Sequence, residues 1–152
     1  MKRQALLAAA AIGLGCTSSA PRPISPAAEE ILASTVAETH AAAVRAVSGL
    51  GLPIRVAEVA DGVVETDYVD IASFRPEAAQ YPMAERLVRF RVAVIAHESN
   101  PATRMTVYAI YSPFRTGLTN VRRGERAVPP DHPAMSLVRR MVTEVRTSVE
   151  RG

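Results

Sequence analysis

The spacing of hydrophobic residues predicts a helix at the start of the folded part of the chain. Apolar residues recur every three or four positions over residues 25–50, which is typical of one apolar stripe on a helix. The stripe consists of Leu32, Val36, Thr39, Ala43, Val47 and Leu50. Ser25 is a candidate N-cap, Pro26 suits the first helical position and Gly51 is a stop signal. We therefore predict that the first helix covers residues 25–50.

After this helix the hydrophobic period changes to two, which predicts β-strands. Four strands are expected, over residues 54–59, 63–69, 87–94 and 104–111. Asp61-Gly62 is typical of a hairpin turn between the first two. On the third strand, Val88, Phe90, Val92 and Val94 alternate with Leu87, Arg89, Arg91 and Ala93. On the fourth, Met105, Val107, Ala109 and Tyr111 alternate with Arg104, Thr106, Tyr108 and Ile110.

Helical spacing returns after Pro133, beyond a long predicted loop over residues 113–132. The element order is therefore helix, four strands, helix. This order predicts an α+β fold, a two-layer sandwich in which a four-stranded antiparallel sheet carries the N- and C-terminal helices on one face. We expect residues 26–152 to form this single domain.

The first fifteen residues have the features of a bacterial lipoprotein signal peptide. Two basic residues at positions 2 and 3 precede an uncharged run over residues 5–14. Ten residues are too few to span a bilayer, which needs about 20. The run ends at Gly15-Cys16, where a lipoprotein signal would be cleaved and the cysteine lipidated.

We therefore predict a signal peptide over residues 1–15, lipidation at Cys16, and a Ser/Pro-rich tether over residues 16–25. The alternative is ordinary secretion with cleavage after Ala20, which Pro21 at the next position disfavours. A lipid chain would supply membrane affinity at about 0.8 kcal/mol per buried CH₂. Either route places the domain in the cell envelope, and the lipid anchors it at the outer or inner membrane, facing the periplasm.

Composition excludes several kinds of chemistry. The chain has 18 basic residues, and its only lysine is Lys2, within the predicted signal peptide. Phosphate-loop, Schiff-base and kinase-type mechanisms need a lysine in the folded domain. With one cysteine, disulfide frameworks, cysteine-based zinc sites and thiol redox pairs are excluded as well. We expect no cofactor and no metal.

The remaining catalytic candidates are histidines and carboxylates. His40, His97 and His132 lie far apart in the sequence and form no metal-binding pair, so structural or surface roles are expected for each. Glu65 and Asp67 are spaced to share one sheet face, and paired carboxylates can act as acid and base. An envelope hydrolase using these groups is therefore an alternative hypothesis.

Arg89 and Arg91 offer a structural explanation for these carboxylates. They repeat the same spacing on the third strand and are predicted to point to the same outer face as Glu65 and Asp67. Cross-strand ion pairs would then satisfy both sets without any ligand. We favour this interpretation over catalysis.

Charge is divided along the chain. Residues 26–85 contain three arginines and ten acidic residues, whereas residues 86–126 contain eight arginines and two glutamates. Arginine recognises carboxylates and phosphates through a planar fork of donors. The candidate binding residues are those of the outer sheet face and of the long loop: Arg89, Arg91, Thr106, Tyr108, Arg115, Arg122, Arg123 and Arg126.

One segment resembles a known family of proteins. Gly51-Leu52-Pro53-Ile54 leads into Asp61-Gly62-Val63-Val64-Glu65-Thr66-Asp67-Tyr68. A helix that ends in glycine, a strand, an Asp/Gly turn and a strand of the form Val-x-Thr-x-aromatic resemble small outer-membrane lipoproteins. Among these lipoproteins, the segment resembles component C of the outer-membrane barrel-assembly machinery. The resemblance implies helices packed on an antiparallel sheet and a non-enzymatic interaction module.

The sequence therefore predicts a lipid-anchored binding module of the cell envelope with no catalytic activity. Its expected partners are the membrane, through the N-terminal lipid, and an envelope protein, an anionic lipid or a cell-wall polymer. Nucleic acid is disfavoured because the signal exports the chain and because few aromatic residues are present for stacking. A lipid or small-ligand carrier is a further alternative, and it would require an apolar cavity between sheet and helices.

Overall fold

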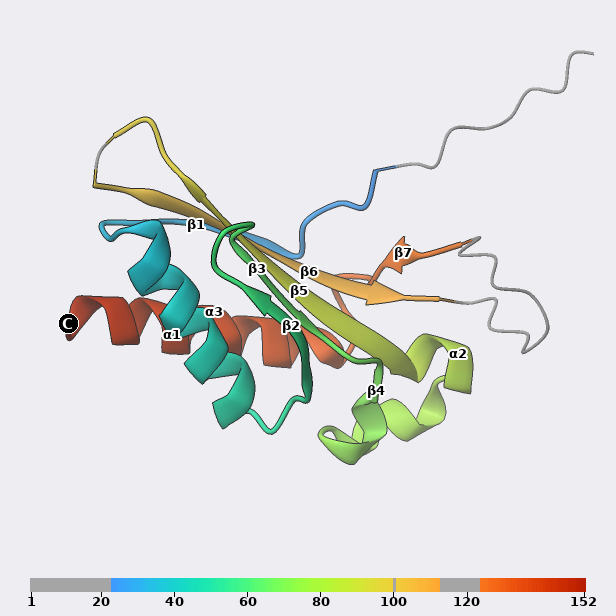
Figure 1. Cartoon of the computed structure of the whole chain (residues 1–152). Helices are drawn as coiled ribbons and strands as arrows, with labels where there is room; N and C mark the ends of the chain where they lie inside the picture. Colours follow the sequence, from blue (N-terminus) through green and yellow to red (C-terminus); the bar gives the residue numbers. More distant parts are fainter. Residues whose placement is uncertain (1–22, 100, 113–123) are drawn as a thin grey trace, which may run out of the picture.

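A computed structural model describes residues 23–99, 101–112 and 124–152, which form one antiparallel sheet with helices (Figure 1). The strands are β1 (Ala28–Leu32), β2 (Ile54–Glu58), β3 (Val63–Thr66), β4 (Val69–Asp70), β5 (Leu87–Ala96), β6 (Thr103–Tyr111) and β7 (Arg126–Ala127). The α-helices are α1 (Val36–Gly49), α2 (Met83–Arg86) and α3 (Ala134–Glu150). Two 3₁₀-helices, η1 (Ile71–Ser73) and η2 (Pro76–Gln80), join β4 to α2.

The sheet has seven strands, and its main path runs β1-β6-β5-β3-β2. The short strands β4 and β7 lie off this path and pair with the two central strands, β4 with β5 and β7 with β6. Every pair is antiparallel. The predicted α+β class and antiparallel sheet are therefore confirmed. The predicted number of four strands is wrong, because β1, β4 and β7 were not anticipated.

The N-terminal half of the predicted first helix is a strand. Residues 28–32 pair with β6 as β1, and the helix begins only at Val36. Thr35 caps α1 in place of Ser25: its side chain accepts from the backbone N–H of Glu38, and the Glu38 carboxylate accepts the Thr35 backbone N–H at 2.9 Å. This reciprocal capping box sets the start of the helix. Pairing with β1 also satisfies an edge of β6 that would otherwise be open.

Helices α1 and α3 lie on the same face of the sheet (Figure 1). Alternate residues of the two long central strands point toward them and are fully buried, Val88, Phe90 and Val92 from β5, and Met105 and Val107 from β6. Leu137, Met141 and Val145 of α3 belong to the same core. The predicted inward set on both strands is therefore confirmed. The opposite face of β5 and β6 is covered by neither α1 nor α3.

Gly62 fixes the turn between β2 and β3 against the neighbouring strand. Its φ of +61° lies in the left-handed region, which favours glycine. Its carbonyl oxygen accepts the N–H of Val94 at 2.7 Å, so the turn packs directly on the β5 backbone. A side chain at this position would collide with the carbonyl oxygen of Val94. The Asp61-Gly62 turn predicted from the sequence therefore has a tertiary role as well as a local one.

Candidate functional site

The candidate site is the outer face of the sheet, formed by the residues of β5 and β6 that point away from α1 and α3. Arg91 lies opposite Tyr108 in the register of these strands, and Ala93 lies opposite Thr106. Residues directly opposite each other in an antiparallel pair share a face. Four of the candidate residues from the sequence therefore come together on this face: Arg89, Arg91, Thr106 and Tyr108. Thr106 is only 8% exposed, so its predicted role as a binding residue is wrong.

Arg89 is held by carboxylates from two sides. Its Nη1 donates to Glu65 Oε1 at 2.9 Å and its Nη2 donates to Glu125 Oε2 at 2.9 Å. Arg55 also binds the Glu65 carboxylate. The Tyr68 hydroxyl donates to Glu125 Oε1 at 3.0 Å, and the Tyr68 ring lies 5.5 Å from Arg89 Cζ. With two arginines and two glutamates, this network balances its own charge.

This network changes the role expected for Arg89. Its side chain is only 13% exposed and that of Glu65 only 10%. Two carboxylates already accept from the terminal guanidinium nitrogens, so Arg89 has little capacity left for a partner. We therefore interpret Arg89 as a residue that organises the face and not as one that contacts a ligand directly.

Arg91 is a solvent-exposed cation of this face. Its side chain is exposed, and it forms no ion pair with any residue that the structure describes. The predicted cross-strand pairing is thus correct for Glu65 and Arg89. For Asp67 and Arg91 it is wrong, because neither is in an ion pair within the described ranges. Asp67 lies past the end of β3, where its backbone N–H donates to Pro53 O at 3.0 Å.

Two exposed isoleucines lie at the other end of the outer face. Ile31 on β1 and Ile95 on β5 both lie opposite Arg104 of β6, and they are 56% and 52% exposed. Glu29 approaches Arg104 with an oxygen 3.6 Å from its Nε. The sequence does not reveal these two residues as part of one face, because its pattern predicts a helix at residue 31 and an end of the third strand at residue 94.

The structure separates Arg126 from the outer face. It lies opposite Tyr111 in the register of β7 and β6, and Tyr111 packs against the core on the helix side of the sheet. Its neighbour Glu125 instead reaches Arg89. Four other predicted site residues lie outside the described residues: Cys16, Arg115, Arg122 and Arg123.

The three histidines have different local roles. The His40 Nε2 lies 3.2 Å from the carbonyl oxygen of Val63, and the ring is buried under β3. His97 Nδ1 accepts the Ser99 N–H at 3.3 Å at the end of β5. His132 Nδ1 accepts the Ala134 N–H at 3.1 Å at the start of α3.

His132 is the histidine with a perturbed pKa. Burial lowers its pKa below the usual 6.5, and the negative charges of Glu85 and Asp131 only partly oppose this effect. Its ring packs edge-on against Tyr81, with centroids 4.7 Å apart. Because Nδ1 accepts a backbone N–H, the neutral ring carries its proton on Nε2. The arrangement holds the start of α3 in place.

Comparison of the chain with protein-family models, curated proteins and solved structures returns no match. The function therefore has to be argued from the geometry. In the part of the chain that the structure describes, no group of three or more His, Cys, Asp or Glu side chains is placed to hold a metal ion. Within the same ranges, no helix is both long and apolar enough to cross a membrane.

Proposed function

We propose that the chain is a lipid-anchored lipoprotein of the bacterial cell envelope that binds a partner through the outer face of its sheet and has no catalytic activity. Cys16, after a short apolar run, is the proposed point of lipidation. The likeness of residues 51–68 to the barrel-assembly lipoprotein supports an interaction module in preference to an enzyme. The partner that we favour is an acidic envelope protein with an apolar contact surface.

The observation that carries this proposal is Arg91, which is exposed and forms no ion pair with any described residue, on the face of the sheet opposite α1 and α3. Tyr108 lies directly across from it, and Ile31 and Ile95 extend the face with exposed apolar surface. Arginine and aromatic residues are enriched at the centres of protein interfaces. Arg89 lies two residues earlier on the same strand, and its own charge is balanced by Glu65 and Glu125.

The hydrolase alternative receives less support. A general base needs a free lone pair near its substrate. The Glu65 carboxylate is engaged by two guanidinium groups, and the Nδ1 lone pair of His132 accepts a backbone N–H. Anionic lipid and cell-wall polymers remain alternative partners for the same arginine.

The carrier alternative requires an apolar cavity between the sheet and the helices. That space is occupied by large, fully buried side chains of both layers, among them Phe90, Met105, Leu137 and Met141. Such dense packing supports a binding surface over an internal ligand site.

Site-specific photocrosslinking in the envelope of a bacterial host tests the proposal. A photoreactive amino acid at position 108 should give a discrete adduct with an envelope protein. The additional change Arg91→Glu should reduce this adduct about tenfold, because it reverses the presented charge.

Arg139→Glu is the matched control, since Arg139 is an exposed arginine of α3 outside the sheet. It should leave the adduct unchanged. Equal loss of the adduct with both charge reversals, or crosslinking to lipid alone, would contradict binding of an acidic protein by this face.

A further inference from the structure

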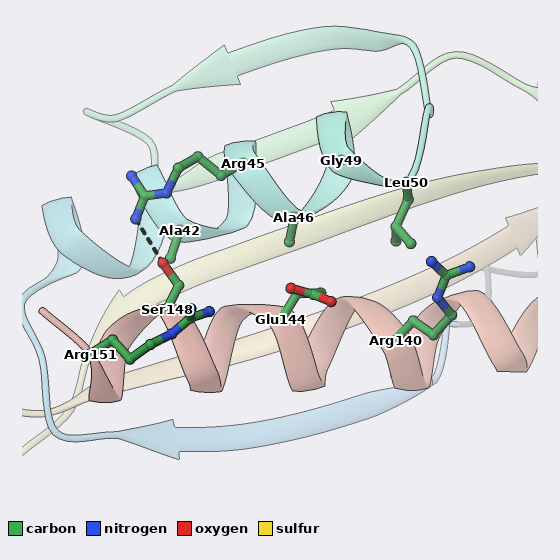
Figure 2. Close-up of a pocket in the computed structure, with 9 residues that line it drawn as sticks. All are labelled: Ala42, Arg45, Ala46, Gly49, Leu50, Arg140, Glu144, Ser148 and Arg151. Atoms are coloured by element: carbon green, nitrogen blue, oxygen red, sulfur yellow. Dashed lines mark hydrogen bonds between the residues drawn. The ribbon is translucent and has the colours of Figure 1, made fainter.

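A groove of about 300 Å³ lies between α1 and α3, on the side of the molecule away from the outer face of the sheet (Figure 2). Along α3, the lining residues follow helical steps of four and three. The groove is lined by Ala42, Arg45, Ala46, Gly49 and Leu50 from α1 and its C-cap, and by Arg140, Glu144, Ser148 and Arg151 from α3 and its C-cap. Small residues of α1 form the floor, and charged residues form the rim.

One end of the groove gathers hydrogen-bond donors from both helices. Arg45 Nη2 donates to Ser148 Oγ at 2.9 Å, which holds the Arg45 side chain across from α3. Arg151 follows Ser148 by one helical turn, and Figure 2 shows the two arginines on either side of this serine. The Nε of Arg151 donates to Thr147 O at 3.1 Å, which leaves its two terminal nitrogens for other acceptors.

The arginines of the groove differ from most others in the described chain. Six described arginines form ion pairs, and none of these six lines the groove. No described carboxylate lies within ion-pair distance of Arg45, Arg140 or Arg151. The Ser148 hydroxyl accepts from Arg45 and still has its own proton to donate. This end therefore offers two guanidinium groups and a hydroxyl to an anion.

We propose that the groove binds a phosphate ester that carries a free hydroxyl group, with its phosphate between Arg45 and Arg151. A phosphate monoester has three free oxygens and a diester has two, arranged tetrahedrally about phosphorus, whereas the two oxygens of a carboxylate lie in one plane with their carbon. Donors that come from two helices and from a serine match the phosphate better. This site lies on helices that cover the other face of the sheet, so it does not depend on the proposed binding face.

Glu144 is the reason for proposing a hydroxyl group on the ligand. Figure 2 shows its carboxylate farther along the groove, between Ser148 and Arg140. An ionised carboxylate only accepts hydrogen bonds, so it would accept from a hydroxyl and would repel a second anionic group. Arg140, one turn before it, offsets part of its charge. A short carbon chain has room in the groove beside α1, because Ala42 and Ala46 have small side chains and Gly49 has none.

A ³¹P NMR titration of the full-length chain in a phosphate-free, non-ionic detergent tests this site with glycerol 1-phosphate as the probe. The phosphorus resonance should broaden and shift in a saturable way. Arg45→Gln and Arg151→Gln should each weaken binding about fivefold, because each removes one charge-assisted contact. Arg45→Lys, which keeps the charge but loses the fork, should fall between the wild type and Arg45→Gln.

The matched control is Arg139→Gln, which removes the same charge from an exposed position of α3 outside the groove. It should leave the affinity within twofold of the wild type. Methyl phosphate has no alcohol hydroxyl and should bind about threefold more weakly than glycerol 1-phosphate, and Glu144→Ala, which removes the acceptor, should abolish this difference. Absence of saturable binding, or equal weakening by Arg139→Gln and Arg45→Gln, would overturn the proposal.

Vesicles distinguish a lipid headgroup from a free ester. Phosphatidylglycerol presents a hydroxyl-bearing phosphate diester, whereas phosphatidylcholine carries no hydroxyl on its headgroup. Binding of phosphatidylglycerol vesicles that is lost with Arg45→Gln would uphold the site and identify the ligand as lipid. Binding of soluble glycerol 1-phosphate without such vesicle binding would uphold the site and identify the ligand as a free ester.

Discussion

Glu65 lies directly opposite Arg91 in the register of β3 and β5, yet its carboxylate binds Arg89, two residues earlier on the same strand. The diagonal contact is favoured because it brings Glu65 into a network that also contains Arg55 and Glu125. One of two neighbouring arginines is thereby neutralised, and the other is left exposed.

This division predicts very different stabilities for two similar variants. Arg89→Ala should lower the free energy of unfolding by about 3 kcal/mol, because it leaves the largely buried carboxylates of Glu65 and Glu125 without their shared partner. Arg91→Ala should lower it by no more than about 0.5 kcal/mol, since the exposed side chain forms no ion pair with the described part of the chain. Urea unfolding followed by circular dichroism measures both values. Equal losses would contradict the division of roles.

The turn at Gly62 should tolerate no side chain. Gly62→Ala places a Cβ against the Val94 carbonyl oxygen at a left-handed φ, and we expect a loss of about 3 kcal/mol in thermal or urea unfolding. Gly51→Ala is the control, since Gly51 also has a positive φ but the nearest atom, of Phe74, lies at 3.9 Å. It should cost only about 1 kcal/mol, from the backbone conformation alone. A smaller loss for Gly62→Ala than for Gly51→Ala would contradict the packing of the turn on β5.

His132 should make the fold sensitive to mild acid. Its folded-state pKa is lowered by burial, so below the unfolded pKa of about 6.5 the unfolded chain takes up a proton that the folded chain resists. The contribution of His132 to the free energy of unfolding should therefore be fully present above pH 6.5. It should be lost as the pH is lowered toward the folded-state pKa. Urea titrations between pH 7.5 and pH 5 (about one unit above and 1.5 below the ordinary pKa) measure this slope.

His132→Asn should flatten the slope in that range and keep an oxygen acceptor near the Ala134 N–H. His97→Asn keeps His132 and should therefore keep the slope. An unchanged pH dependence in the His132→Asn variant would show that other groups cause it.

The proposed anchor predicts a change in location when Cys16 is replaced. Cys16→Ser should remove incorporation of a palmitate analogue and release the chain from the membrane fraction, because no lipid can then be attached. Ser18→Ala, two residues later, should leave both measurements unchanged. Membrane association that survives Cys16→Ser would contradict lipidation at this residue.

The sequence predicted the central strands well and the first element poorly. Alternation over residues 87–94 is strong because Val88, Phe90 and Val92 are buried on one side, and such a pattern has one interpretation. Residues 28–32 show no hydrophobic period of two, because the inward position 30 of β1 is a glutamate and the exposed position 31 is an isoleucine. The Thr35-Val-Ala-Glu38 capping box was the local signal that could have placed the boundary.

The candidate sites were predictable to different degrees. Ion pairing between the carboxylates at residues 65 and 67 and the arginines of the third predicted strand follows from strand spacing, and the structure shows it for Glu65. The choice between Arg89 and Arg91 depends on Glu125, which reaches the sheet from a distant part of the chain. The groove between α1 and α3 depends on contacts between distant parts of the chain. Arg45 and Ser148, which form one of these contacts, are 103 residues apart in the sequence. Strands β4 and β7 have two residues each, too few to show a period.

The position of β1 has a mechanical consequence for a chain held at its N-terminus. β1 is the first element after the proposed tether, and it is hydrogen-bonded along its length to the central part of the sheet, from Ala28 opposite Val107 to Leu32 opposite Thr103. A pull on the tether along the direction of β1 would load the hydrogen bonds between β1 and β6 in shear, so that they resist together before any force reaches α1. A domain tethered in this way can withstand tension between the membrane and a bound partner while its core stays intact.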